Sequence, residues 1–82
     1  MSPSKWGWQM AKRDYNDAVT ACLGDIHTRL SEATRIAKAA EACAHAGSIA
    51  EAVTISMEIE QLIYEAGRLH DAASLMNRLS QV

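Results

Sequence analysis

The sequence has few of the residues that break helices and few of those that fill a large core. It has one proline, at position 3, four glycines, two cysteines and no phenylalanine. Because proline is confined to the N-terminus, helices are permitted along almost the whole chain. Two cysteines do not make a disulfide framework, so Cys22 and Cys43 are expected to be reduced thiols that pack as small apolar side chains.

Other absences exclude several kinds of site. The sequence has no His-Glu-x-x-His or Glu-x-x-His motif, no glycine-rich phosphate loop and no nucleophile elbow. No apolar run reaches the ~18 residues of a membrane span. Residues 1–17 also lack the apolar region of a signal peptide. We therefore expect a cytoplasmic protein that is not an enzyme, holds no cofactor or metal and binds no membrane.

The apolar residues that are present are mostly small. Fifteen alanines stand against fifteen leucine, isoleucine and valine residues in a chain of 82, which we interpret as a single domain, residues 1–82. Alanine lets helices approach closely but buries little area per residue. So small a domain also has a narrow margin of stability, and we expect it to gain stability by pairing with another surface.

Three glycines divide the chain into segments of helical character. If Gly24, Gly47 and Gly67 each end a helix, the fold is all-α, a small up-down four-helix bundle or helical array. The predicted helices are residues 4–23, 25–46, 48–66 and 69–82. Ser48 with Glu51 is predicted to form a capping box. Spacing of four and three residues predicts that the second helix buries Ile26, Leu30, Ala33, Ala37, Ala40 and Ala44.

Two of the predicted corners have similar sequences, "AHAGSIAEA" and "YEAGRLHDA". The stretch "YEAGRLHDAASLMNRL" resembles the turn of a tetratricopeptide-repeat hairpin, which implies a peptide-binding helical array. The three glycines, however, are 23 and 20 residues apart, whereas that family repeats every ~34 residues. The sequence is therefore assigned to no family.

The predicted helix 48–66 has a narrow polar stripe and a wide apolar arc. The stripe consists of Glu51, Thr54, Glu58, Gln61 and Glu65. So wide an arc indicates either a central helix with several neighbours or a helix partly covered by another chain, and both readings stay open. Glu60 lies opposite Glu51 on the wheel. It either reaches water at the edge of the bundle or pairs with an arginine or histidine across helices or chains.

Charge is distributed unevenly, with five glutamates and no lysine or arginine in residues 41–67. This region is either a solvated face or a docking stripe for a basic partner. A helix-turn-helix over residues 41–53 would use an acidic recognition helix that phosphate repels, so we expect no nucleic-acid binding.

The stretch "KWGWQM" places Trp8 in the core, with Trp6 and Met10 on the wetter side of the first predicted helix. Tryptophan is a frequent interface anchor, although Trp6 folded back over the end of the bundle is an equal alternative.

The sequence thus predicts a non-enzymatic protein–protein interaction module: a small adaptor, secretion-type chaperone or regulator. We expect it to self-associate as a homodimer, to bind a helical or basic protein, or both. The alternative is a helical DNA-binding transcriptional regulator. The predicted partner-binding residues are Trp6, Met10, Glu51, Val53, Met57, Glu58, Glu60, Tyr64 and Glu65.

Overall fold

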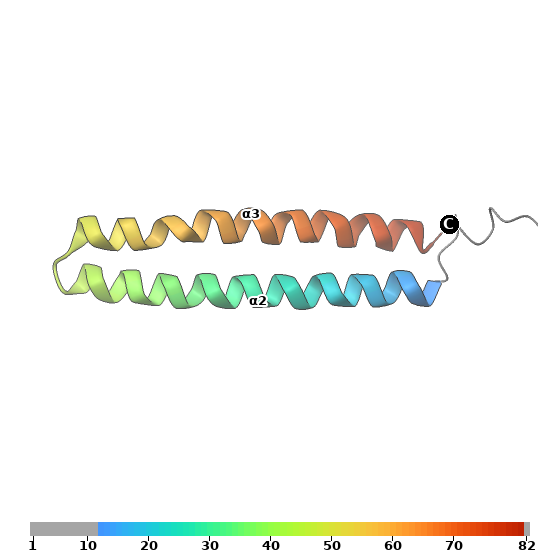
Figure 1. Cartoon of the computed structure of the whole chain (residues 1–82), viewed down its shortest axis with the longest axis horizontal. Coiled ribbons are helices and arrows are strands. Elements are labelled where there is room, and N and C mark those ends of the chain that lie inside the picture. The colour runs from blue at the N-terminus through green and yellow to red at the C-terminus, as the bar shows by residue number, and fades with distance from the viewer. Residues whose placement is uncertain (1–11, 82) are drawn as a thin grey trace, which may run out of the picture.

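The fold is a helical hairpin. The computed structural model describes residues 12–81, in which helix α2 (Lys12–His45) and helix α3 (Ile49–Leu79) are joined by a short turn. The two helices lie side by side and antiparallel along their whole lengths (Figure 1). All-α structure, as predicted, is confirmed for the described residues.

The four-helix prediction is wrong. Residues 12–45 form one helix that passes through Gly24, and residues 49–79 form another that passes through Gly67. The predicted breaks at 23–25 and 66–69 are therefore absent, and so is the repeat-like turn at Gly67. A glycine inside a helix costs only about 1 kcal/mol relative to alanine. Because apolar residues continue at helical spacing on both sides of Gly24 and Gly67, continued packing against the opposite helix outweighs that cost.

Gly47 is the one predicted helix stop that the structure confirms. Its φ of 94° lies in the left-handed region, which glycine enters without a steric penalty. The Ser48 N–H donates to the Cys43 carbonyl at 3.1 Å, and the Gly47 N–H donates to the Ala44 carbonyl at 2.9 Å. This pair of bonds is a Schellman motif with Gly47 at C′.

The turn does not contain the predicted capping box. Ser48 is the N-cap residue of α3, but its side chain makes no capping hydrogen bond. Its carbonyl instead accepts from the Ala52 N–H at 2.9 Å, which starts the backbone ladder of α3. The helix start is therefore set by the backbone bonds of the turn.

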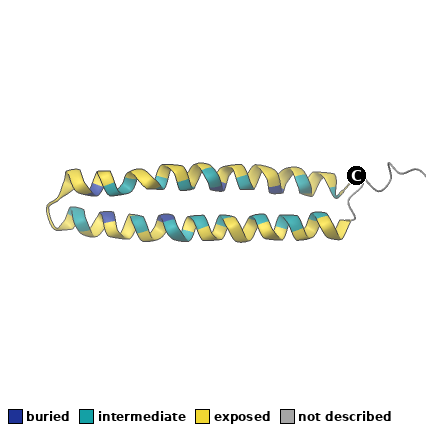
Figure 2. Cartoon of the chain, in the orientation of Figure 1, coloured by how far each residue is buried: buried dark blue, intermediate teal, exposed yellow. Residues whose placement is uncertain are grey.

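Buried and half-buried residues form a seam along the facing sides of the two helices (Figure 2). Among residues 12–81, five are buried, and all five are alanine; the other seam residues are half-buried. The seam positions recur every seven residues in two interleaved rows, the pattern of an a/d coiled-coil contact. On α2 they are Tyr15, Val19, Cys22, Ile26, Arg29, Ala33, Ile36, Ala40 and Cys43; on α3 they are Ala52, Ile55, Ile59, Leu62, Ala66, Leu69, Ala73 and Met76.

The predicted burial of α2 is only partly correct. Ile26, Ala33 and Ala40 lie in the seam, but Leu30 and Ala37 are exposed. The structure uses Arg29 and Ile36 instead, one position earlier in each case. A shift of one residue rotates a helix by about 100°, so it moves Leu30 from the seam to the side of the hairpin.

The register of the two helices follows from the turn. Arg29 and Glu65, which contact each other, are the same number of residues from Gly47. Positions equidistant from Gly47 are therefore about level. Larger side chains lie level, within one residue, with alanines: Leu62 with Ala33, Ile55 with Ala40. This alternation explains why the buried positions are alanines.

Both cysteines lie on α2. Cys22 and Cys43 are half-buried free thiols, 21 residues apart in one helix, or about 31 Å along its axis. Their separation along a single helix excludes a disulfide between them.

Candidate interaction surfaces

The seam leaves two long sides of the hairpin open, and these differ in chemistry. In heptad notation, with the seam at a and d, the g positions of both helices border one side and the e positions border the other. A groove between the helices is lined by Glu32, Ile36, Glu58, Gln61, Leu62 and Glu65, so the g positions Glu32, Glu58 and Glu65 share one side. The e positions therefore share the opposite side.

The g positions form an acidic flank. It consists of Asp25 and Glu32 on α2 and Glu51, Glu58 and Glu65 on α3. Two of its carboxylates have partners within the chain. Arg29 donates from Nε to Glu65 at 3.2 Å, and Arg35 pairs with Glu32.

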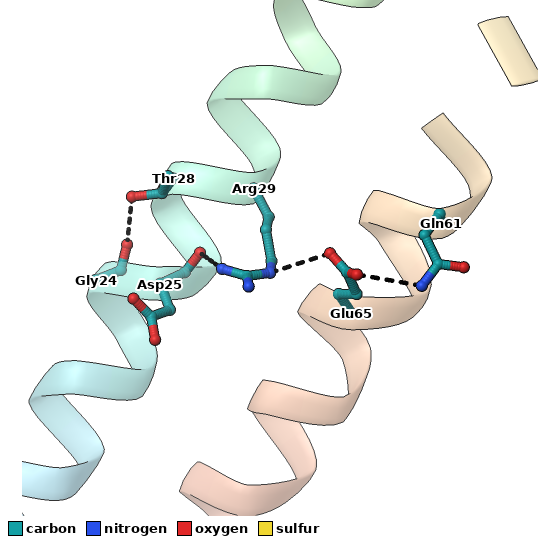
Figure 3. Close-up of polar contacts among 6 residues, drawn as sticks. All are labelled: Gly24, Asp25, Thr28, Arg29, Gln61 and Glu65. Carbon is teal, nitrogen blue, oxygen red and sulfur yellow. Dashed lines mark hydrogen bonds and ion pairs between the residues drawn. The ribbon is translucent and has the colours of Figure 1, made fainter. Parts of the chain in front are cut away.

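Arg29 is the one charged residue in the seam of the described residues, and its contacts explain how it is tolerated there. It lies level with Ala66, whose small side chain leaves room for it. Its guanidinium reaches the acidic flank and also donates to the Asp25 carbonyl at 3.4 Å (Figure 3). Gln61 donates to the second oxygen of Glu65 at 3.1 Å, so that carboxylate is held from both helices. Both members of the ion pair are more than one-third exposed, so it adds little to stability.

The other side forms an apolar flank. At e positions it has Leu23 and Leu30 on α2 and Ile49 and Ile63 on α3. Val53, Met57 and Tyr64 extend it over the adjoining outer face of α3. These seven side chains are 41–67% exposed. Ala37, Ala44 and Ser56 fill the remaining e positions between the two ends of the row, so no charge interrupts the row from Leu23 to Ala44 on α2 or from Ile49 to Ile63 on α3.

Glu60 is the one carboxylate within the apolar flank. It is exposed and lies with Met57, Gln61 and Tyr64 around a shallow depression on α3. No ion pair or hydrogen bond joins its carboxylate to another described residue. It therefore stands apart from the g-position carboxylates, on the opposite side of the hairpin.

The structure divides the predicted partner-binding residues between the two flanks. Glu51, Glu58 and Glu65 lie on the acidic flank, whereas Val53, Met57, Glu60 and Tyr64 lie on the apolar flank. Trp6 and Met10 lie outside the described residues.

The predicted partner-binding residues do not include Leu23, Leu30, Ile49 or Ile63. The signal that finds Leu23 and Leu30 is the seven-residue spacing of Cys22, Arg29, Ile36 and Cys43, which fixes the seam and leaves the residue after Cys22 and Arg29 at its edge. On α3 the same spacing of Ile55 and Leu62 leaves Ile63 at the edge.

The described residues contain neither a cluster of potential metal ligands nor a candidate membrane span. No group of three or more histidine, cysteine or acidic side chains among residues 12–81 is placed to hold a metal ion. Neither described helix is long and apolar enough to cross a membrane.

No protein family, curated protein or solved structure matches this chain. We therefore infer the function from the chemistry of the two flanks.

Proposed function

We propose that this chain is a non-enzymatic protein–protein interaction module, acting in the cytoplasm, whose apolar flank packs against helices of another protein chain. The observation that carries the proposal is the contrast between core and surface. Every buried residue in the described part of the chain is an alanine, while leucine, isoleucine, valine, methionine and tyrosine side chains along the flank remain exposed to water.

The small apolar area buried within the hairpin favours association with a partner. Burying a leucine or isoleucine side chain stabilises a protein by about 1.5–3 kcal/mol, whereas burying an alanine methyl group contributes well under half of that. A single core in a domain of this size rarely supplies more than about 3–5 kcal/mol. Covering the apolar flank adds a second contact layer to a hairpin whose own seam is thin.

The shape of the flank favours a helical partner. Exposed apolar side chains at e positions, spaced by seven residues, present a second stripe parallel to the first. Such a stripe accepts the ridge of another helix in the same way as the seam does. This is the arrangement expected of an adaptor, chaperone or regulator that works by joining a helical assembly.

The DNA-binding alternative gains no support from the geometry around Gly47. The two helices of a helix-turn-helix cross at about 90–120°. Here they lie antiparallel along their lengths, and α3 carries four glutamates. It is not proposed.

Photo-cross-linking tests the proposal. A photoreactive amino acid at Val53 lies on the apolar flank; the same residue at Thr54, also exposed and adjacent in α3, faces the side of the g positions. We expect Val53 to form discrete protein adducts in cells that produce the chain, and Thr54 to form few. Equal labelling at the two positions, or none at Val53, would refute the proposal.

A further inference from the structure

The apolar flank is large enough for a specific interface. Along α2 it runs from Leu23 to Ala44, which is 21 residues, or about 32 Å. With a width of about two helix diameters, roughly 20 Å, it covers about 600 Å². That approaches the ~800 Å² that each partner contributes to a standard interface.

Resting on the proposed function, we propose that the occupant of the apolar flank is a second copy of this chain, with α2 of each copy packed on α3 of the other and both turns at the same end. The flank is complementary to itself in this arrangement. Ile49 of one copy lies level with Ala44 of the other, so a large side chain meets a small one, and Leu30 lies beside Ile63.

Charge selects this arrangement over the one with α3 on α3. Helix α2 carries five basic and five acidic residues, whereas α3 carries two basic and five acidic residues. Packing α3 on α3 places two helices of net charge −3 side by side, each with Glu60 within the apolar flank, and like charges across an interface oppose association. Packing α3 on the neutral α2 avoids this repulsion.

The same arrangement gives Glu60 a partner. Glu60 and Thr34 are equidistant from Gly47, so Glu60 of one copy comes level with Thr34 of the other. Lys38 lies one helical turn from Thr34 towards the corner and is exposed. Its long side chain meets the Glu60 carboxylate at the edge of the interface. Glu60 of one copy and Lys38 of the other thus form an ion pair, and the two-fold symmetry of the dimer gives two such pairs.

A charge-swap experiment tests both the occupant and the arrangement. Sedimentation equilibrium of the whole chain is expected to show a dimer, and Glu60→Lys or Lys38→Glu alone is expected to weaken dimerisation by about fivefold or more. The double variant Glu60→Lys with Lys38→Glu restores dimerisation to near that of the unmodified chain. Glu58→Lys is the matched control, because it changes the same charge on the acidic flank and leaves dimerisation unweakened.

The outcomes separate this inference from the proposed function. A dimer that the double variant fails to restore overturns the arrangement. A monomer at all concentrations, together with Val53 adducts to a different protein, overturns the second copy but leaves the interaction module standing. A monomer without preferential Val53 adducts overturns both.

Discussion

The two flanks border the same seam on the same two helices, yet they place different demands on their surroundings. The acidic flank needs no second protein: water solvates its carboxylates, and Arg29, Arg35 and Gln61 hold two of them within the chain. The apolar flank exposes Leu23, Leu30, Ile49 and Ile63 to water in a row, and no described residue covers these side chains fully. The seam is formed by the opposite sides of the two helices and does not include those side chains, which is why we propose that a second chain covers them.

Adjacent residues in α3 give the sharpest division between seam and flank. Leu62 lies in the seam and Ile63 lies on the apolar flank, 52% exposed. We expect Leu62→Ala to lower the free energy of unfolding by about 2–3 kcal/mol, the low end for a leucine truncation because Leu62 is half-buried. Its effect persists at every protein concentration.

Ile63→Ala is the matched control for that experiment. We expect it to lower stability chiefly at concentrations where the chain associates, because Ile63 is 52% exposed in the single hairpin and the proposed second copy covers that exposed part. Urea unfolding at about 1 μM and 100 μM, followed by circular dichroism, measures both. If Ile63→Ala is as costly as Leu62→Ala in dilute solution, the seam has been assigned to the wrong face.

The two-helix fold requires helices that continue through Gly24 and Gly67, and substitution of the three glycines tests that continuity. Gly47→Ala forces a side chain into the left-handed region and is expected to cost about 1–2 kcal/mol. Gly24→Ala and Gly67→Ala are expected to stabilise the chain by about 0.5–1 kcal/mol each, because alanine favours helix. A Cβ added at either position meets no atom within 4 Å.

Thermal unfolding of the three glycine variants provides the measurement. Under a four-helix arrangement all three glycines would end helices and all three substitutions would be destabilising. A loss of stability in Gly24→Ala or Gly67→Ala would therefore break the account of two continuous helices.

The smallest expected effect lies on the acidic flank. A double-mutant cycle on Arg29→Met and Glu65→Gln is expected to give a coupling energy of about 0.2–1 kcal/mol, since both groups are partly exposed. The coupling falls as salt is raised, because the pair is screened. A coupling energy well above that range, unaffected by salt, would mean that the acidic flank contributes as much to the free energy of unfolding as the seam does, contrary to our expectation.

The fold was predictable in part from the sequence. The absence of proline after position 3 and the alanine content correctly indicate an all-helical chain, and Gly47 correctly marks a corner. The neighbourhoods of Gly24, Gly47 and Gly67 look alike locally. What distinguishes Gly47 is long-range: seam positions continue with seven-residue spacing through the other two glycines.

The flanks are harder to predict because they depend on which residues of each helix face the opposite helix. The wide apolar arc of residues 49–64 was visible, and so was the polar stripe on α3. Spacing alone allows Leu30 or Arg29 to face the opposite helix, and hydrophobicity favours Leu30. The structure chooses Arg29, since its guanidinium reaches Glu65 across the groove while Ala66 leaves space beneath it. That choice requires knowledge of the residue 36 positions away.

We propose that this chain associates through the apolar flank and not through the acidic flank. Sedimentation equilibrium of three forms tests it most directly: the unmodified chain, Leu30→Glu with Ile63→Glu on the apolar flank, and Glu51→Gln with Glu58→Gln on the acidic flank. Circular dichroism checks that each stays helical, as expected for changes at exposed positions. We expect the association constant of the apolar-flank variant to fall at least about thirtyfold, which is equivalent to the ~2 kcal/mol hot-spot threshold. The acidic-flank variant is expected to associate as tightly as the unmodified chain. Undiminished association of the apolar-flank variant, or an equal loss in both variants, would contradict it.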